Sequence, residues 1–440
     1  MNRTMSAVIL FSMLGLTSCN DTISQKTSPT PSSEQKTSLP PPVQKVRRPA
    51  LAIGSLQMKK ERMAADRQAG MTVHLLSVIW GRMEPQEGKF SSEESDRVRS
   101  EIAAARAAGF EISVDFGLQY PPEWVFKNPD SHYRNQYGDE YAGDKPGCNG
   151  YNTVFVQANR ERVERFVKHF FQEFGTDFQS IRLGWGYYGE LNYPIHRFKP
   201  RMPADAQERT NCYWSFDDIA QGRKPGLAAG ISKYPVPGWK PGDPSPNGEA
   251  KQFLEWYLGA MQNFHDWQIR FLRSQYAGRL CMMYPSWGIR PGWLDAAIAG
   301  NLNGKTSPEK NGEIQRGFDF SRFISGIADP HVVVYCTWID AKTLPADADQ
   351  KANVNSWSPV RYLSQLARDH QPKLEIWGEN TGPGVKEQLG ISFQRARDNG
   401  LLGVMWAFDP QLHDGAPGNA TLEEFSAEIR KWEKSGTAAK

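Results

Sequence analysis

Two glutamates in this chain stand at the ends of apolar runs. Glu190 follows the run Ser180–Leu183, and Glu379 follows the run Lys373–Trp377. Two carboxyl groups can share acid–base work when one, kept protonated, donates to a leaving oxygen while the other attacks carbon or activates water. Either residue alone would be read as a solvated surface glutamate. Because both stand at predicted strand ends, we predict a catalytic pair, with Glu190 as acid (or acid/base) and Glu379 as nucleophile or base.

The glycines before Glu190 also fit the dinucleotide-binding pattern G-x-G-x-x-G, at Gly184, Gly186 and Gly189. In that motif the glycines open a helix whose N-terminus holds a pyrophosphate. Here the sequence continues Glu-Leu-Asn-Tyr-Pro, and Pro194 opposes a helix at this point. The carboxylate of Glu190 would also repel a phosphate. The pattern therefore predicts no nucleotide site, and no cofactor is expected.

Short apolar runs alternate with helical patterns from residue 50 onward. We predict strands over residues 50–54, 71–80, 110–116, 180–185, 278–284, 331–336, 373–377 and 401–407. Strand–helix alternation is typical of a parallel sheet, and eight such units in one domain predict an α/β fold, a closed (β/α)8 TIM barrel. An open doubly wound sheet is the alternative, which eight units without a second domain disfavour.

The barrel prediction brings the two glutamates to one place. Active sites of such barrels lie at the C-terminal ends of the strands. Side chains alternate along a strand, so Leu374 and Ile376 should face the helices, while Glu375, Trp377 and Glu379 should point into the barrel. Strands four and seven lie across the barrel from one another, which places the two carboxyl groups on opposite sides of one mouth.

The barrel domain is predicted to span residues 48–435, with a long irregular insert at about residues 191–248. The insert is rich in Pro and Gly and carries several aromatic residues. Irregular segments of this length in a compact domain are usually functional or signal a wrong assignment of elements. A helical pattern over residues 249–277 follows the insert.

The N-terminal residues resemble an export signal. A basic start and the apolar stretch Ala7–Leu16 read as a signal peptide over residues 1–18. Leu16-Thr17-Ser18-Cys19 resembles the bacterial lipobox, in which the cysteine is lipidated; a plain secretory signal is the alternative. Asn20 is not the aspartate of inner-membrane retention, which favours the outer membrane or the cell surface. Residues 19–47, rich in Ser, Thr, Pro, Gln and Lys, read as a disordered tether.

Composition disfavours one class of binding partner, and the positions of the cysteines limit which of them could form a disulfide. The formal net charge is +3 without a basic stripe, which disfavours nucleic acid. Cys281 and Cys336 lie in apolar runs and are predicted to be buried. Cys148 and Cys212 lie in polar segments and could pair in an exported protein, but sequence cannot place them. No motif predicts a metal site, and nothing indicates the oligomeric state.

Further candidates for the mouth of the barrel are residues close to the predicted strand ends. Polar side chains there can hold hydroxyl groups, and aromatic rings can stack on the C–H face of a sugar. Core packing or a structural hydrogen bond is the competing interpretation for each one taken singly. The predicted substrate-binding residues are Arg82, Asp115, Trp124, Asn192, Trp287, Trp338, Asn380 and Trp406.

Two family resemblances meet in this chain. The segment Ser77–Phe90, with Pro121-Pro122-Glu123-Trp124, resembles the N-terminal half of the barrel in family 42 β-galactosidases and related clan A glycoside hydrolases. The segments Gly189–Pro194 and Gly378–Asn380 resemble the two catalytic motifs of β-amylases (family 14). In that family the first glutamate is the general acid and the second the general base. The combined resemblance covers about residues 50–430.

The two resemblances imply different mechanisms. Likeness to clan A implies retention with Glu379 as nucleophile, whereas likeness to β-amylase implies inversion with Glu379 as base. The chain departs from both: Gly189 replaces the usual asparagine before the clan A acid, and Leu118–Pro122 stands where β-amylases have a closing loop. The prediction is therefore a cofactor-independent hydrolase of O-glycosidic bonds in an extracellular oligo- or polysaccharide. A catalytically silent carbohydrate-binding surface lipoprotein is the alternative.

Overall fold

The computed structural model describes residues 51–141, 150–195, 211–305, 308–341, 349 and 351–434. Outside these residues lie the predicted signal peptide, Cys19, the tether and Cys148. The predicted option of a disulfide between Cys148 and Cys212 therefore stays a prediction. Among the described helices none is long and apolar enough to cross a membrane.

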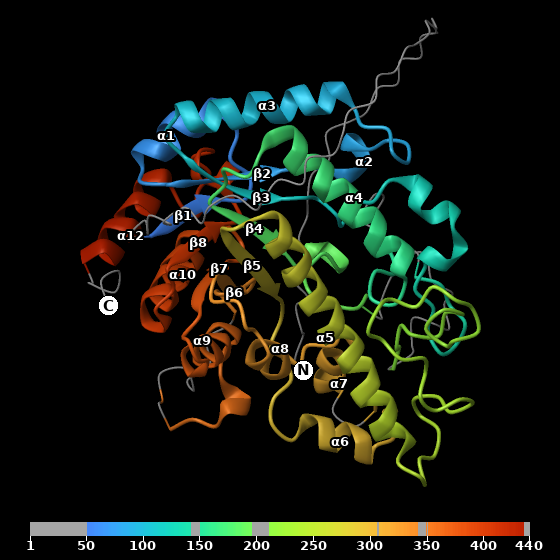
Figure 1. Ribbon diagram of the computed structural model, residues 1–440. Helices are drawn as coiled ribbons and strands as arrows, with labels where there is room; N and C mark the ends of the chain where they lie inside the picture. The colour runs from blue at the N-terminus through green and yellow to red at the C-terminus, as the bar shows by residue number, and fades with distance from the viewer. Residues whose placement is uncertain are drawn as a thin grey trace, which may run out of the picture. The chain divides into compact units, whose positions relative to one another are not determined.

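Eight parallel strands close into a barrel in sequence order (Figure 1). They are β1 (Ala52–Ser55), β2 (Val73–Ser77), β3 (Glu111–Asp115), β4 (Ser180–Leu183), β5 (Arg279–Tyr284), β6 (Val332–Cys336), β7 (Glu375–Glu379) and β8 (Gly403–Trp406). Strand β1 pairs with β8, from Ala52 opposite Gly403 to Ser55 opposite Trp406, and this pairing closes the sheet. The prediction of a (β/α)8 barrel is confirmed.

Helices follow the strands and cover the outside of the barrel (Figure 1). They are α1 (Met63–Gln68), α2 (Trp80–Met83), α3 (Ser92–Ala107), α4 (Gln157–Phe174), α5 (Glu249–Gln275), α6 (Trp293–Ala299), α7 (Pro308–Gln315), α8 (Phe320–Ser325), α9 (Pro359–Asp369), α10 (Lys386–Asn399), α11 (Asp409–Leu412) and α12 (Leu422–Lys434). Helix α3 begins where Ser91 accepts a hydrogen bond from the Glu94 amide. Helix α10 ends at Gly400, whose φ of 69° suits glycine.

Two layers of side chains make the core. Outward-facing strand residues such as Ile181 and Val334 pack under the helices, and inward-facing residues such as Leu75, Met283 and Trp377 fill the barrel. At the N-terminal end of the barrel the guanidinium of Arg279 pairs with the carboxylate of Glu375 at 2.8 Å. Cys281 and Cys336 are buried, as predicted. The interior is therefore packed below the mouth, which leaves the C-terminal strand ends as the place for chemistry.

The described part of the insert, residues 211–248, packs along the long helix α5. Its aromatic side chains Tyr213, Trp214, Tyr234 and Trp239 are all buried. Tyr213, for example, meets Phe253 of α5 edge to face at 5.2 Å. These rings extend the hydrophobic core beyond the barrel.

Candidate active site

Glu379 lies at the end of β7 and points into the barrel. Its Oε2 accepts hydrogen bonds from Arg182 Nη2 at 2.7 Å and from the Tyr335 hydroxyl at 2.8 Å. Arg182 comes from β4 and Tyr335 from β6, so three strands position one carboxylate. The predicted alternation along β7 is confirmed: Ile376 packs under the helices, while Trp377 belongs to the interior cluster.

Glu379 shifts the pKa of both side chains that donate to it. Burial disfavours a charged guanidinium, yet the adjacent carboxylate of Glu379 holds the pKa of Arg182 above its ordinary value. Burial and the same negative charge raise the pKa of Tyr335 well above its ordinary value, so its hydroxyl remains a donor. A charge-assisted pair of this kind holds a carboxylate in one orientation. Both donors bind Oε2.

Glu190 has the opposite environment. It is partly buried just beyond β4. Burial is the main cause that raises its pKa, and the negative charge of Glu379 adds to it, whereas a hydrogen bond with Thr337 and the charge of Arg316 lower it; the resulting pKa is about 7. A carboxyl group with such a pKa is protonated in a large fraction of molecules near neutral pH, as a general acid must be. The structure thus brings the two predicted glutamates within electrostatic reach of one another.

The glycines of the segment GWGYYGE shape the loop that carries Glu190. At Gly184 the backbone φ is 141°, and a Cβ there would lie only 2.5 Å from the carbonyl oxygen of Gly189. The Gly186 amide donates to the Glu190 carbonyl at 2.9 Å, and the Leu191 amide donates to the Met283 carbonyl of β5 at 3.1 Å. The glycine pattern therefore serves a tight turn that fixes Glu190, in agreement with the rejection of a nucleotide site.

Among the described residues, three of the five non-glycine residues with a positive φ lie near these strand ends. Trp185, Tyr188 and Ser286 have φ values of 47°, 59° and 63°. The first two lie in the loop before Glu190, and the third follows β5. Non-glycine residues in this region cost roughly 1–3 kcal/mol each and cluster at functional sites. Their gathering at the C-terminal face agrees with a site there.

Comparison with known proteins finds similar folds among solved structures. No family model matches the chain, and no curated protein matches it. Among solved structures, the catalytic domain of β-amylase from Paenibacillus polymyxa matches with a TM-score of 0.60 and 14% identity, over 87% of this chain and 97% of that one. The chain shares the (β/α)8 barrel fold of that catalytic domain. At this level of identity the likeness concerns the fold.

Two β-galactosidases have a similar barrel fold. The enzyme from the psychrophilic Marinomonas ef1 matches with a TM-score of 0.53 and 13% identity, over 88% of this chain and 60% of that one. A family 42 β-galactosidase from G. stearothermophilus matches with a TM-score of 0.52 and 12% identity, over 89% of this chain and 58% of that one. This chain therefore spans less than two thirds of the length of either β-galactosidase.

Two of the four predicted tryptophans meet at the mouth of the barrel. Trp287 follows β5, Trp338 follows β6, and both are partly exposed. Their rings pack edge to face, with centroids 5.9 Å apart and planes at 72°. Two rings held at this angle present an apolar corner with polar N–H edges, which suits the C–H face and the hydroxyl groups of a sugar.

The other two tryptophans belong to the core, which corrects their assignment to substrate. Trp124 is buried, and its Nε1 donates to the Glu84 carbonyl at 2.9 Å. Trp406 is fully buried beside Phe425 of α12, with centroids 6.3 Å apart. Because Met405 faces the barrel interior, Trp406, the next residue on β8, faces the helices. Neither ring offers a face to a ligand.

Of the four predicted polar residues, two are exposed or partly exposed and two are buried. Asp115 is partly exposed at the end of β3 and lies close enough to Arg182 to influence its pKa. Arg82 is exposed on α2. Asn380 is buried and accepts a hydrogen bond from the Ala407 amide at 2.8 Å, which ties β7 to the segment after β8. Asn192 is buried too, and neither asparagine presents its side chain at the surface of the mouth.

Four residues that contact or influence Glu190 and Glu379 were not predicted from the sequence: Arg182, Tyr335, Thr337 and Arg316. Arg182 carried a usable signal, because an arginine inside the apolar run Ser180–Leu183 points inward on the same alternation that placed Glu379. Tyr335 and Thr337 alternate inward on and after β6 in the same way. Arg316 carried no such signal, since it lies in the irregular segment between α7 and α8.

Proposed function

We propose that this protein is a glycoside hydrolase that cleaves O-glycosidic bonds with Glu190 as the acid and Glu379 as the anionic partner. The observation that carries the proposal is the contrast between the two carboxyl groups. Burial raises the pKa of Glu190 to about 7, whereas Glu379 is paired with Arg182 and hydrogen-bonded by Tyr335. Two carboxyl groups with opposed environments are what glycosidic cleavage requires.

In the proposed reaction Glu190 donates its proton to the glycosidic oxygen as the bond to the anomeric carbon breaks. Positive charge then develops on the sugar ring, and the carboxylate of Glu379 stabilises it. If Oε1 of Glu379 attacks the anomeric carbon, a covalent ester forms, and the Glu190 carboxylate then takes a proton from the water that releases the sugar. If Glu379 instead takes the proton from water, the reaction ends in one step with inversion. The anomer of the first product distinguishes the two routes.

The substrate proposed is an extracellular oligo- or polysaccharide. Trp287 and Trp338 support it, because their paired rings at the mouth match the apolar face of a sugar. The N-terminal sequence supports an exported lipoprotein anchored through Cys19 at the outer membrane or cell surface. The fold neighbours are glycoside hydrolases, which agrees with a carbohydrate as substrate.

The test is hydrolysis of a broad panel of glycosides and polysaccharides, followed as reducing sugar or released aglycone. Glu190→Gln and Glu379→Gln each keep the size of the side chain and should lower kcat/KM by several orders of magnitude. Glu111→Gln is the matched control, since Glu111 is exposed at the opposite end of the barrel on β3. Parent-like cleavage by the two site variants would show that the assigned pair is wrong. Binding of glycans without cleavage would favour the silent carbohydrate-binding protein.

A further inference from the structure

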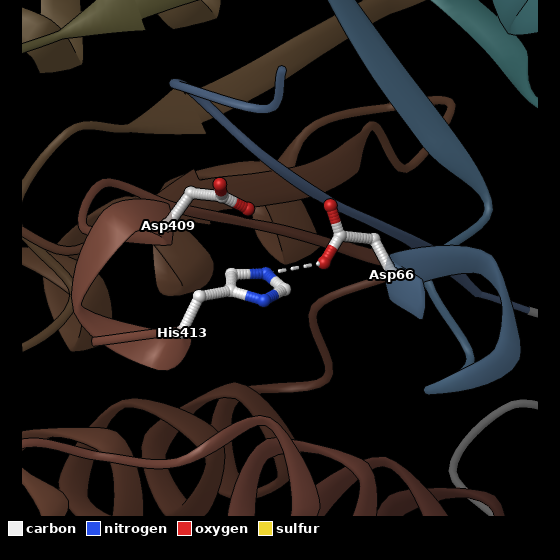
Figure 2. Close-up of side chains that lie close together, drawn as sticks. All are labelled: Asp66, Asp409 and His413. Atoms are coloured by element: carbon white, nitrogen blue, oxygen red, sulfur yellow. Dashed lines mark hydrogen bonds and ion pairs between the residues drawn. The ribbon is translucent and has the colours of Figure 1, made fainter. Parts of the chain in front are cut away.

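Three side chains capable of binding a metal gather outside the barrel, at the seam where β1 meets β8. Asp66 comes from α1, Asp409 begins α11, and His413 follows α11. One potential ligand atom from each lies within 4.8 Å of the others. Figure 2 shows the two carboxyl groups pointing toward one another, with the imidazole ring beside them. Both aspartates are fully buried, which sets the group apart from an ordinary solvated acidic patch.

The hydrogen bonds of this group leave one buried oxygen without a partner. Asp409 accepts from the Ser55 hydroxyl at 2.9 Å and pairs with the Arg62 guanidinium at 3.3 Å. Asp66 Oδ1 lies 2.8 Å from His413 Nε2, but Asp66 Oδ2 is buried and has no hydrogen-bond partner among the described residues. A buried carboxylate oxygen in that state is costly, typically by about 1–3 kcal/mol or more. The carboxyl groups of Asp66 and Asp409 point toward one another (Figure 2), and a cation between them would stabilise this arrangement.

We propose that Asp66, Asp409 and His413 bind one divalent transition-metal cation of the Zn²⁺ or Mn²⁺ type. The ligands would be Asp66 Oδ2, one carboxylate oxygen of Asp409 and a ring nitrogen of His413. Imidazole with carboxylate is a ligand set that suits these ions, whereas Ca²⁺ and Mg²⁺ prefer oxygen alone. Arg62 and Ser55 would hold the Asp409 carboxylate in place from behind, as outer partners of metal ligands do.

The geometry requires only a small closure. Zinc–ligand distances of about 2.0–2.2 Å place tetrahedral ligand atoms roughly 3.4 Å apart. The three ligand atoms lie within 4.8 Å of one another, so small rotations of the side chains would bring them to that value. The ion would link α1, which follows the first strand, to α11, which follows the last, and would thereby clamp the seam that closes the barrel. Its role is structural and independent of the proposed hydrolysis.

The test uses the full protein, freed of metal by chelation and dialysis. ZnCl2, MnCl2 and CaCl2 are added separately, and the melting temperature and the binding stoichiometry by calorimetry are measured. We expect one equivalent of Zn²⁺ or Mn²⁺ to bind and, at about 100 times its Kd, to raise Tm by roughly 3 °C. Ca²⁺ should give a much smaller shift. Because hydrolysis is not the readout, failure here is distinct from failure of the proposed function.

Three variants decide whether the cluster is the site. Asp66→Asn and His413→Gln should abolish the metal-dependent rise in Tm while far-UV circular dichroism stays native. His331→Gln is the control, since His331 is an exposed histidine that lies near an aspartate elsewhere on the surface. Absence of any shift in the parent with either transition metal would overturn the proposal, and so would parent-like binding by His413→Gln. In that case the cluster is a self-sufficient network of the two carboxyl groups, Arg62 and His413.

Discussion

Arg182 and Glu379 meet inside the mouth of the barrel, with Nη2 of the arginine 2.7 Å from Oε2 of the glutamate. They are 197 residues apart in sequence and come from β4 and β7. Both side chains are almost completely buried. A buried pair with good geometry is worth little as a source of stability, but breaking one partner leaves a lone charge in a dry interior. The pair therefore has clear consequences for mutation.

Arg182→Met should destabilise the protein by about 3–5 kcal/mol, because Glu379 would remain buried without its cation. The measurement is the free energy of unfolding in denaturant. The double variant Arg182→Met with Glu379→Gln should recover a large part of this loss, since it removes the lone charge as well. If the double variant lost the sum of the two single effects, the side chains would not be coupled as the structure indicates.

Tyr335→Phe should show how much orientation of Glu379 contributes to turnover. The change removes one of two donors to Oε2 and keeps the ring, over which the Arg182 guanidinium lies at 5.0 Å. We expect kcat to fall by roughly 10- to 100-fold, since a lost hydrogen bond to a charged group is worth about 1.5–3 kcal/mol. KM should change little. Tyr362→Phe, at a tyrosine outside the barrel interior, is the control, and an equal loss of kcat there would argue against a specific role for Tyr335.

The sequence predicts the orientation of some residues of the site and not of others. Alternation placed Glu379 inward because the period of a strand is a local property. The same alternation, applied to Met405 and Trp406, would have turned Trp406 toward the helices. The burial of Trp124 could not be predicted in this way, because an aromatic residue after a strand suits the core and the surface equally. The contact of Asp66 with His413 spans 347 residues and depends on the closure of the barrel, so no local pattern could reveal it.

The pH dependence of hydrolysis should follow Glu190. Its pKa is raised to about 7, and the acid must be protonated to donate, so kcat/KM should fall about tenfold per pH unit above neutrality. Thr337→Val removes the hydrogen bond that lowers this pKa and should move the alkaline limb to higher pH. A limb that stayed in place in Thr337→Val would assign the titration to another group.

The same shift links Glu190 to stability. A carboxyl group whose pKa is higher folded than unfolded holds more protons in the folded state between about pH 4.5 and 7. Its contribution is fully present below the unfolded pKa and is lost as pH rises through the folded pKa. Glu190→Gln stays neutral at every pH, so its stability relative to the parent should increase between pH 4.5 and 7. Denaturant unfolding at several pH values measures this, and a constant difference between the two proteins would contradict it.

The paired tryptophans and the buried tryptophan should respond differently to truncation. Trp287→Ala or Trp338→Ala should raise KM roughly 2- to 10-fold, since a lost ring contact is worth about 0.5–1.5 kcal/mol, and should leave Tm nearly unchanged. Trp406→Ala should instead lower the free energy of unfolding by about 3–5 kcal/mol, because it empties a fully enclosed site beside Phe425. Kinetics and unfolding measured on all three variants separate the two groups. A stability loss in Trp287→Ala equal to that of Trp406→Ala would assign Trp287 to the core.

Gly184→Ala should damage the site without unfolding the barrel. The added Cβ would lie 2.5 Å from the Gly189 carbonyl oxygen, at a φ of 141° that alanine rarely adopts, so the loop that carries Glu190 must shift. A displacement of about 1 Å at a catalytic group can cost 100-fold in rate, and we expect kcat to fall by that order. Gly259→Ala is the matched control, because Gly259 lies in α5 and its added Cβ meets no atom within 4 Å. If Gly184→Ala retained full activity, the loop could not be the rigid support for Glu190 that its hydrogen bonds indicate.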